Sequence, residues 1–328
     1  MTSYMASLVL QMENEGRMGT AHVYRSTLNR VLHFTEGRPL SFSGMDARWL
    51  KEFQNYLLGR QLQWNSISTY MRMLRAVYWR AVDQGYVPYR PRLFKGVYTG
   101  TRVTVKRAVD EQVWRRLEVS PQPAASGVEK ARQLFLLLFM LRGIPFVDIA
   151  YLRKCDLQGN VLVYRRRKTG AWLTVTVEPR AMRLIDCLKN TDDRSPYLFP
   201  YINKVGVAAY RQYQNALRGF NASLKRLGAW AGVGVSLSSY CARHSWATIA
   251  NYCNYQPELI CNAMGHSSVK VTETYFKPHT DERIGRMNRE ILSHVFFKVS
   301  GEFSVTLQVT EDANVCQAKD GIFSIKNK

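Results

Sequence analysis

The strongest constraint on the fold of this chain is a break in its helical periodicity between Gly85 and Arg107. This stretch holds two prolines, two further glycines and no apolar repeat of three to four residues. Such a composition is typical of a connecting segment, because proline and glycine interrupt regular secondary structure. It divides the 328 residues into two parts, each long enough to bury a hydrophobic core. We therefore predict domains over residues 1–84 and 108–293, joined by a linker over 85–107.

The first part, residues 1–84, has the pattern of a small all-α domain. Apolar residues recur at near-helical spacing over 23–34 and 49–57. A further helix is expected to begin near Asn65, with the apolar residues between Ile67 and Tyr78 packed inward. Three arginines project away from that apolar face: Arg72, Arg75 and Arg80.

The chain is strongly basic, with 46 Lys and Arg against 25 Asp and Glu and a formal net charge of +21. Ten Lys or Arg but one acidic residue, Asp83, lie between Arg60 and Arg107, which leaves few partners for intrachain ion pairs. A polyphosphate backbone best screens such a charge, so nucleic acid is preferred over a ribosomal or membrane-surface role. The expected phosphate contacts are Arg72, Arg75, Arg80, Lys106, Arg107, Arg165, Arg166 and Arg167.

The six cysteines are scattered, without the close pairs of a zinc ribbon or a redox motif, and we interpret them as reduced thiols. Cys253, Cys261 and His266 lack a clear fourth ligand, so no metal site and no cofactor are expected. The start of the chain has no basic leader followed by an apolar run, and no stretch approaches the roughly 20 apolar residues that cross a bilayer. We expect a cytoplasmic protein without a membrane partner.

The second part mixes helical and β patterns. Residues from Gln133 to Leu141 are apolar on nearly all faces, which predicts a buried helix. Two β-rich stretches, 161–167 and 171–177, flank Thr169-Gly170 and predict a basic hairpin. Helical patterns return beyond residue 178, most clearly over 236–250 and 258–264. The expected fold class is mainly α with a small β-sheet: an all-α domain followed by an α+β domain.

Residues in this second part resemble the signature of the tyrosine recombinase family, which includes phage integrases and Xer-like proteins. The motif Arg243-His244-Ser-Trp-Ala-Thr is followed by Gly265-His266 and, nine residues after this histidine, by Tyr275. The likeness extends over about 108–293, and more loosely to the N-terminal helices, which correspond to the family's core-binding domain. Integrases and invertases of conjugative elements look most similar.

The resemblance implies a site-specific DNA recombinase that integrates, excises or inverts a DNA element. Its two domains would form a C-shaped clamp around double-stranded DNA, and four copies would assemble on DNA, with room for accessory DNA-bending or directionality proteins. Cleavage would proceed through a covalent 3′-phosphotyrosyl intermediate, which needs neither metal nor ATP because the protein–DNA ester keeps the energy of the broken bond.

The resemblance also assigns catalytic roles. Tyr275 is the expected nucleophile, and Arg243 would hold non-bridging oxygens of the scissile phosphate with two parallel donors. Lys168, on the hairpin tip, would protonate the leaving 5′ oxygen. His266 would hydrogen-bond the phosphoryl oxygen or assist proton transfer. His244 is expected to be structural, because it points to a different helix face from Arg243.

Two positions depart from the family pattern. Tyr240 stands where the family usually has a histidine, and a tyrosine is a poorer acid or base at neutral pH. Pro145 stands where the pattern Gly-Leu-Arg-x-x-Glu-Leu has its first catalytic arginine. We expect Pro145 in the first turn of a helix and Arg142 at the end of the preceding one, where Arg142 would replace the missing arginine. After Arg142, the next candidates to replace the missing arginine are Arg165, Arg166 and Arg167.

Other functions remain open. A non-catalytic sequence-specific DNA-binding relic or accessory factor would have the same fold, and a type IB topoisomerase would use the same chemistry. A metal-dependent nuclease is disfavoured because no paired-carboxylate motif accompanies the basic stretches.

After Tyr275, the apolar residues from Ile284 to Leu292 predict a helix that, by the resemblance, docks on a neighbouring protomer. Alternation over 303–310 predicts a strand, and with it a β-hairpin, in a C-terminal tail over 294–328.

Overall fold

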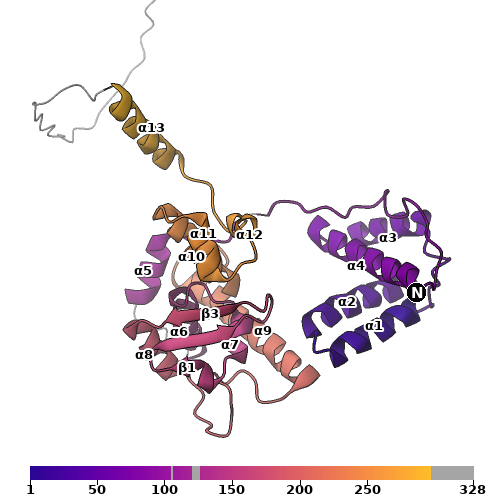
Figure 1. Ribbon diagram of the computed structural model, residues 1–328, viewed down its shortest axis with the longest axis horizontal. Helices are drawn as coiled ribbons and strands as arrows, with labels where there is room; N and C mark the ends of the chain where they lie inside the picture. Colours follow the sequence, from indigo (N-terminus) through magenta and orange to yellow (C-terminus); the bar gives the residue numbers. More distant parts are fainter. Residues whose placement is uncertain (105, 120–125, 297–328) are drawn as a thin grey trace, which may run out of the picture. The chain divides into compact units, whose positions relative to one another are not determined.

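Figure 1 shows the computed structural model of the chain, which is mainly helical with one small sheet. The structure describes residues 1–104, 106–119 and 126–296. The predicted fold class is confirmed. Two large clusters of buried apolar side chains form separate cores, one built from residues 1–97 and one from residues 109–249.

The first core lies among α1 (Thr2–Asn14), α2 (Met18–Phe34), α3 (Ala47–Gly59) and α4 (Trp64–Asp83). One face of each helix contributes buried apolar residues, as the spacing predicts. The helix α3 begins after Asp46, whose carboxylate accepts a hydrogen bond from the Trp49 amide at 2.7 Å and so satisfies a free N–H of the first turn. On α4, Arg72 is exposed, whereas Arg75 and Arg80 are half-buried.

The first part of the expected linker lies on these helices instead of spanning freely. Leu93 is buried in the first core. The Tyr98 amide donates to Gln54 Oε1 at 2.7 Å, and Ser68 Oγ donates to the Gly100 carbonyl at 2.6 Å. Arg102 and Asn65 exchange two further hydrogen bonds. Leu93 and these hydrogen bonds therefore attach the proline- and glycine-rich stretch to the helical domain, without a helix or strand among its described residues.

The second core is built around α6 (Ser126–Met140), which packs against α8 (Pro179–Leu188), α9 (Gly206–Trp230) and α10 (Ser239–Tyr252). This confirms the buried helix predicted from the apolar run. The remaining helices are short or peripheral: α5 (Glu111–Val119), α7 (Phe146–Tyr151), the 3-10 helix η1 (Lys154–Asp156), α11 (Pro257–Met264) and α12 (Val269–Glu273).

The sheet is antiparallel, in the order β1 (Leu157–Gln158), β2 (Val161–Arg165) and β3 (Trp172–Thr176). Val161 pairs with Thr176 and Arg165 with Trp172, which confirms the predicted hairpin. The tip is closed by hydrogen bonds from Arg166 N to Ala171 O and from Gly170 N to Arg166 O. This tip carries most of the basic residues that the sequence singles out.

The segment from Pro278 onward forms a separate unit. Its helix α13 (Asp281–Phe296) includes the predicted helical stretch and exposes four large apolar side chains: Ile284, Met287, Ile291 and Leu292. The strand and hairpin predicted in the tail lie outside the described residues. None of the helices in the described ranges is long and apolar enough to span a bilayer.

Candidate active site

Two buried arginines meet at one backbone carbonyl. Arg243 on α10 is 3% exposed and Arg166 on the hairpin tip is 5% exposed. Arg243 Nη2 and Arg166 Nη1 donate to the same Met264 oxygen, at 2.8 and 2.7 Å. Burial lowers the pKa of Arg243, and the nearby charge of Arg166 lowers it further. Two cations held this close in a desolvated place repel each other, so the arrangement favours an anion between or beside them.

Two glycines allow the backbone to approach these arginines. Gly143 has φ +66°, and a Cβ there would lie 2.7 Å from the Arg243 Cα. Gly265 has φ +61°, and a Cβ there would lie 2.9 Å from the Arg166 Cδ. Both carbonyls accept hydrogen bonds, Gly143 O from Arg243 Nη1 at 2.8 Å and Gly265 O from Arg166 Nη1 at 3.0 Å. A side chain at Gly143 would clash with the backbone of Arg243, and one at Gly265 would clash with the side chains of Arg166 and Leu173.

Asp148 on α7 fixes the hairpin tip. This carboxylate is almost fully buried, and its Oδ2 accepts from Arg166 Nε at 3.2 Å while its Oδ1 accepts from the Arg167 amide at 2.9 Å. Burial raises the pKa of Asp148, opposed by the Arg167 amide and by the Arg166 charge. Asp148 occupies the acidic position of the family pattern and here orients Arg166.

Arg142 lies in the turn between α6 and α7. The helix α6 ends at Met140, and Pro145 is the N-cap residue of α7, one position before the first turn. The intervening turn uses two consecutive residues with positive φ, Arg142 (58°) and Gly143. In this turn the Arg142 guanidinium donates to the Thr174 carbonyl on β3 at 3.2 Å. The structure therefore brings Arg166, and not Arg142, to the carbonyl that Arg243 also contacts.

The sequence contains a signal for Arg166 that the motif comparison misses. Side chains alternate between the two faces of a strand. Leu162 and Tyr164 are buried, and the same alternation continues to Arg166, while Arg165 and Arg167 are exposed. A basic residue on the buried face of a hairpin needs a partner or a function.

Tyr275, which follows α12, lies beside Arg243. Its side chain interacts electrostatically with Arg243 and with Tyr240. The Arg243 Cζ is 5.6 Å from the centre of the Tyr275 ring, and the His266 ring is 5.0 Å from it. Burial, followed by the neighbouring Tyr275, raises the pKa of Tyr240. The structure thus groups four of the expected catalytic residues: Tyr240, Arg243, His266 and Tyr275.

His266 is held in one neutral form. Arg243 Nη2 lies 2.7 Å from His266 Nε2, and Thr272 Oγ1 lies 2.8 Å from His266 Nδ1. Burial and then the charges of Arg243, Arg166 and Lys168 lower the pKa of His266 to about 3. Because a guanidinium can only donate, Nε2 must accept, and the proton resides on Nδ1 and is donated to Thr272. Sequence reasoning missed Thr272, a fully buried residue of α12.

The backbone around Tyr275 is held from both sides. The Tyr275 carbonyl accepts from Thr248 Oγ1 at 3.1 Å, and His244 Nδ1 lies 3.4 Å from the same oxygen. Lys106, expected to contact DNA, donates to the Thr274 carbonyl. Asp110 pairs with Lys277 at 3.3 Å. The last residues before α5 therefore contact the segment that carries Tyr275.

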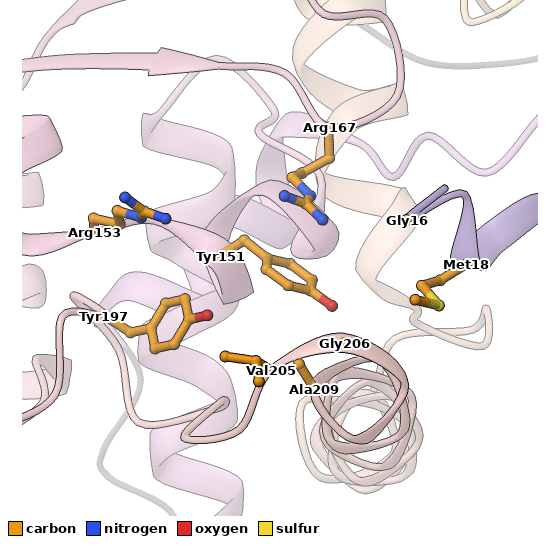
Figure 2. A pocket seen from close by; sticks show the side chains of 9 residues that line it. All are labelled: Gly16, Met18, Tyr151, Arg153, Arg167, Tyr197, Val205, Gly206 and Ala209. Carbon is orange, nitrogen blue, oxygen red and sulfur yellow. The ribbon is translucent and has the colours of Figure 1, made fainter. Parts of the chain in front are cut away.

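The other basic candidates lie around the hairpin and the linker. Lys168 is exposed at the tip, and its charge acts on His266. Arg165 is exposed and donates from Nε to the Gly170 carbonyl at 2.9 Å, and Arg107 is exposed. The Arg167 guanidinium lies 4.1 Å from the centre of the Tyr151 ring, next to which Figure 2 shows it. Both residues line a pocket together with Arg153 and Tyr197.

Among the described residues, no three side chains of His, Cys, Asp or Glu gather in the way a metal ion requires. Cys253 is exposed, whereas Cys261 is buried and its Sγ lies 3.7 Å from the His266 carbonyl oxygen.

Comparisons with known protein families agree with the resemblance seen in the sequence motifs. The Phage integrase SAM-like domain matches residues 1–96, and the Phage integrase family matches residues 118–282. No curated protein sequence matches the chain.

Solved structures with a similar fold include three recombinases. The Tn1549 transposon integrase in complex with transposon right end DNA is 14% identical, with a TM-score of 0.60 over 89% of this chain and 99% of that chain. A lambda integrase dimer bound to a COC′ core site is 12% identical, with a TM-score of 0.61 over 86% of this chain and 96% of that chain. XerH site-specific recombinase in a post-cleavage complex with palindromic difH substrate is 16% identical, with a TM-score of 0.62 over 91% of this chain and 85% of that chain.

At these identities the structures show a shared fold, and the family assignment comes from the sequence. The family's catalytic region matches half of the chain and includes Arg243, His266 and Tyr275, which the structure brings together. The chain therefore belongs to the phage integrase family, the tyrosine recombinases.

Proposed function

We propose that this chain is a site-specific DNA recombinase that cleaves and rejoins DNA strands through a covalent bond to Tyr275. The observation that carries this proposal is the pair of buried guanidiniums, Arg243 and Arg166, at one carbonyl, with the Arg243 Cζ 5.6 Å from the centre of the Tyr275 ring. Asp148 offsets the charge of Arg166, whereas Arg243 forms no ion pair among the described residues, so a phosphate next to Arg243 would balance the second charge beside Tyr275. The DNA in the complexes of the similar structures supports DNA as the substrate.

In the proposed reaction, the Tyr275 oxygen attacks the phosphorus, so that a P–O(Tyr) bond forms and the bond from phosphorus to the 5′ oxygen breaks. Neutral His266 can accept the phenol proton, because its Nε2 has a free electron pair once the Arg243 Nη2 donates to the phosphate instead. Lys168 donates the proton that the leaving 5′ oxygen takes up. Attack by another 5′ hydroxyl on the phosphotyrosyl ester reverses the step and joins a new pair of strands.

Arg243 and Arg166 take the two phosphate-holding roles. Each guanidinium has planar, permanently charged donors that match phosphate oxygens, and each is positioned by fixed backbone or carboxylate contacts. Arg166 takes the place that Pro145 leaves vacant. Arg142 is assigned no catalytic role, since its guanidinium is bound to the sheet.

The remaining roles follow from charge and exposure. The helical domain, with Arg72, Arg75 and Arg80, is proposed to grip the DNA together with the hairpin residues Arg165 and Arg167. The exposed apolar face of α13 suits docking on a neighbouring copy of the chain, which would link the protomers of a tetramer on DNA.

Tyr275→Phe tests the proposal. The change removes one hydroxyl and little contact area, so it should abolish the covalent protein–DNA product while DNA binding stays nearly intact. Nicked suicide substrates, made from DNA that flanks the coding sequence and incubated in EDTA, would trap the product for detection by denaturing gel. An adduct of equal yield with the variant would exclude Tyr275 as the nucleophile. Wild-type protein that binds the DNA without any adduct would instead identify a non-catalytic DNA-binding protein of the same fold.

A further inference from the structure

The peptide group that precedes Tyr275 is held at both of its ends. Its N–H, which belongs to Tyr275, donates to the Thr272 carbonyl at 2.9 Å. Its oxygen, which belongs to Thr274, accepts a hydrogen bond from Lys106 Nζ. Thr274 is the C-cap residue of α12, and carbonyls at the end of a helix have no partner within it. Lys106 therefore satisfies a carbonyl that the helix itself leaves free.

The peptide group that follows Tyr275 is held in the same way. Its N–H, which belongs to Phe276, donates to the Glu273 carbonyl at 3.1 Å. Its oxygen accepts from Thr248 Oγ1 at 3.1 Å, and Thr248 Oγ1 in turn accepts from the Lys277 amide at 3.2 Å. Thr248 is 3% exposed on α10, so both bonds form away from solvent. A hydroxyl can give one proton and accept another, and here both capacities serve the backbone around Tyr275.

Fixing both peptide groups fixes the direction of the side chain between them. A peptide group is planar, so two held planes determine the φ and ψ of Tyr275 and the direction of its Cα–Cβ bond. The side chain then has only a few staggered rotamers available. The centre of the Tyr275 ring lies 5.6 Å from the Arg243 Cζ and 4.5 Å from the centre of the His244 ring. The backbone contacts therefore direct the phenol toward Arg243.

The chain beside Lys106 is itself fixed to α10. The Val109 amide donates to Ser245 Oγ at 2.9 Å, and both residues are buried. Lys106 is half-buried, whereas the neighbouring Arg107 is exposed. A half-buried lysine three residues from a buried anchor has a restricted reach, so its ammonium stays near the Thr274 carbonyl.

We propose that Lys106 and Thr248 are positioning residues for Tyr275. They hold the two peptide groups that flank the nucleophile, one from the segment before α5 and the other from α10. This rests on the proposed function in taking Tyr275 as the nucleophile. It gives Lys106 a different role from the phosphate contact that its charge suggests. Because each residue acts through the backbone, its loss should lower the rate of cleavage and leave DNA affinity unchanged.

Lys106→Met tests the first peptide group, because methionine keeps a long unbranched stem and lacks the ammonium. Lys130→Met is the matched control, since Lys130 is an exposed lysine on α6. At saturating DNA, adduct formation on the suicide substrate should fall between about tenfold and about a hundredfold for Lys106→Met, as it does when a reacting group is slightly misplaced. Lys130→Met should form the adduct at the wild-type rate.

The alternative role of Lys106 gives a different result. A normal maximal rate for Lys106→Met would overturn the proposal. If the slope of log affinity against log salt were also smaller by about 0.9, Lys106 would be assigned to a DNA phosphate instead. The proposal predicts an unchanged slope and an unchanged DNA concentration for half the maximal rate.

Thr248→Val tests the second peptide group, and Thr248→Ser keeps the hydroxyl there. Valine has nearly the shape of threonine but can neither donate nor accept a hydrogen bond. The valine variant should form the adduct about tenfold more slowly at saturating DNA, and the serine variant should recover most of the rate. Equal rates for the two variants, at equal melting temperatures, would exclude the role of Thr248. Lys106→Met, at a half-buried site, carries the test if the valine variant does not fold.

Hydrogen exchange measures the positioning without any cleavage. Exchange of the Tyr275 and Phe276 amides is followed by mass spectrometry on the full chain without DNA. Lys106→Met and Thr248→Val should each speed up this exchange, and Lys130→Met should leave it as in the wild type, because local opening becomes easier when a holding contact is lost. Unchanged exchange in both Lys106→Met and Thr248→Val would contradict the proposal.

The two readouts separate this proposal from the proposed function. Wild-type protein that forms no adduct would refute the proposed cleavage, and faster exchange in the two variants would still support Lys106 and Thr248 as the residues that hold Tyr275. Wild-type protein that forms the adduct, with variants of equal rate and equal exchange, would refute the positioning role alone.

Discussion

The candidate active site has two sides, a helical side from α10 to Tyr275 and a sheet side with α7 and the β2–β3 hairpin. They differ in how closely their residues follow the family's motif. On the helical side, α10 to Tyr275, the motif residues Arg243, His266 and Tyr275 lie next to one another. On the sheet side, the family's arginine position is Pro145, which caps α7 and carries no charge. The residue that we propose in its place is Arg166, on the hairpin tip.

In the proposed mechanism, the position of the second charge is therefore more constrained than the element that supplies it. Arg166 reaches the Met264 carbonyl from the hairpin, and Asp148 keeps the position of the family's acidic residue and holds Arg166 by its Nε. We therefore propose that a long side chain on the hairpin tip replaces the one lost from the turn, which keeps its glycine. Gly143 still allows the backbone to approach Arg243.

On the sheet side, substitution of Lys168 should slow cleavage more than any other change except the substitution of Arg166. Lys168→Ala should slow cleavage by roughly 10²–10⁴, as removal of a placed general acid does. A substrate with sulfur in place of the 5′ bridging oxygen has a leaving group that needs no proton and should recover much of the rate. If the sulfur substrate gives no recovery, Lys168 contacts phosphate without acting as the acid.

Thr272 tests the helical side with a smaller effect. Thr272→Val removes the acceptor of the His266 Nδ1–H and leaves a buried donor unpaired, at a cost of about 1–3 kcal/mol. Adduct formation should fall about tenfold, and Thr272→Ser, which keeps the hydroxyl, should restore it. The rates would be compared on a suicide substrate, with melting temperatures recorded alongside. An unchanged rate for the valine variant would mean that the orientation of His266 does not depend on Thr272.

The smallest effect concerns pH and stability. The folded protein holds His266 neutral with a pKa of about 3, below its ordinary value of 6.5, so between these values the unfolded chain binds more protons. The His266 contribution to the free energy of unfolding should therefore decrease as the pH falls from about 6.5. Urea unfolding at pH 7 and pH 5 would measure it, with His266→Gln as the reference. A contribution that increases toward pH 5 would show that His266 is charged in the folded state.

The sequence predicts those parts of the fold that depend on local periodicity. It does not predict features that depend on turns and on contacts between elements. The α6 run and the hairpin have strong local periodicity, and the spacing from His266 to Tyr275 follows from one short helix. The position of Arg142 could not be predicted, because it depends on a turn of two residues with positive φ between α6 and α7. Thr272 acquires its role only through a contact across that helix.

The segment after α4 illustrates a similar limit. Its prolines and glycines indicate a linker, and they do exclude regular structure. They do not reveal that Leu93 is buried, or that Tyr78 holds Pro88 and Arg90 in place, because these contacts join residues that share no periodic pattern. Composition therefore predicted the absence of a helix there, and tertiary packing decided where the segment lies.

The most direct test of the account compares Arg166→Ala with Arg142→Ala for covalent adduct formation on the same suicide substrate. Removing a placed charge-stabilising donor typically costs 10²–10³ in rate. Arg166→Ala should lose at least this much, Arg166→Lys should recover little because a point charge cannot hold two oxygens, and Arg142→Ala should cleave at nearly the wild-type rate. Melting temperatures, and Asp148→Asn as a second way to release Arg166, separate chemistry from folding. A normal rate for Arg166→Ala, or a loss of orders of magnitude for Arg142→Ala at unchanged stability, would contradict the account.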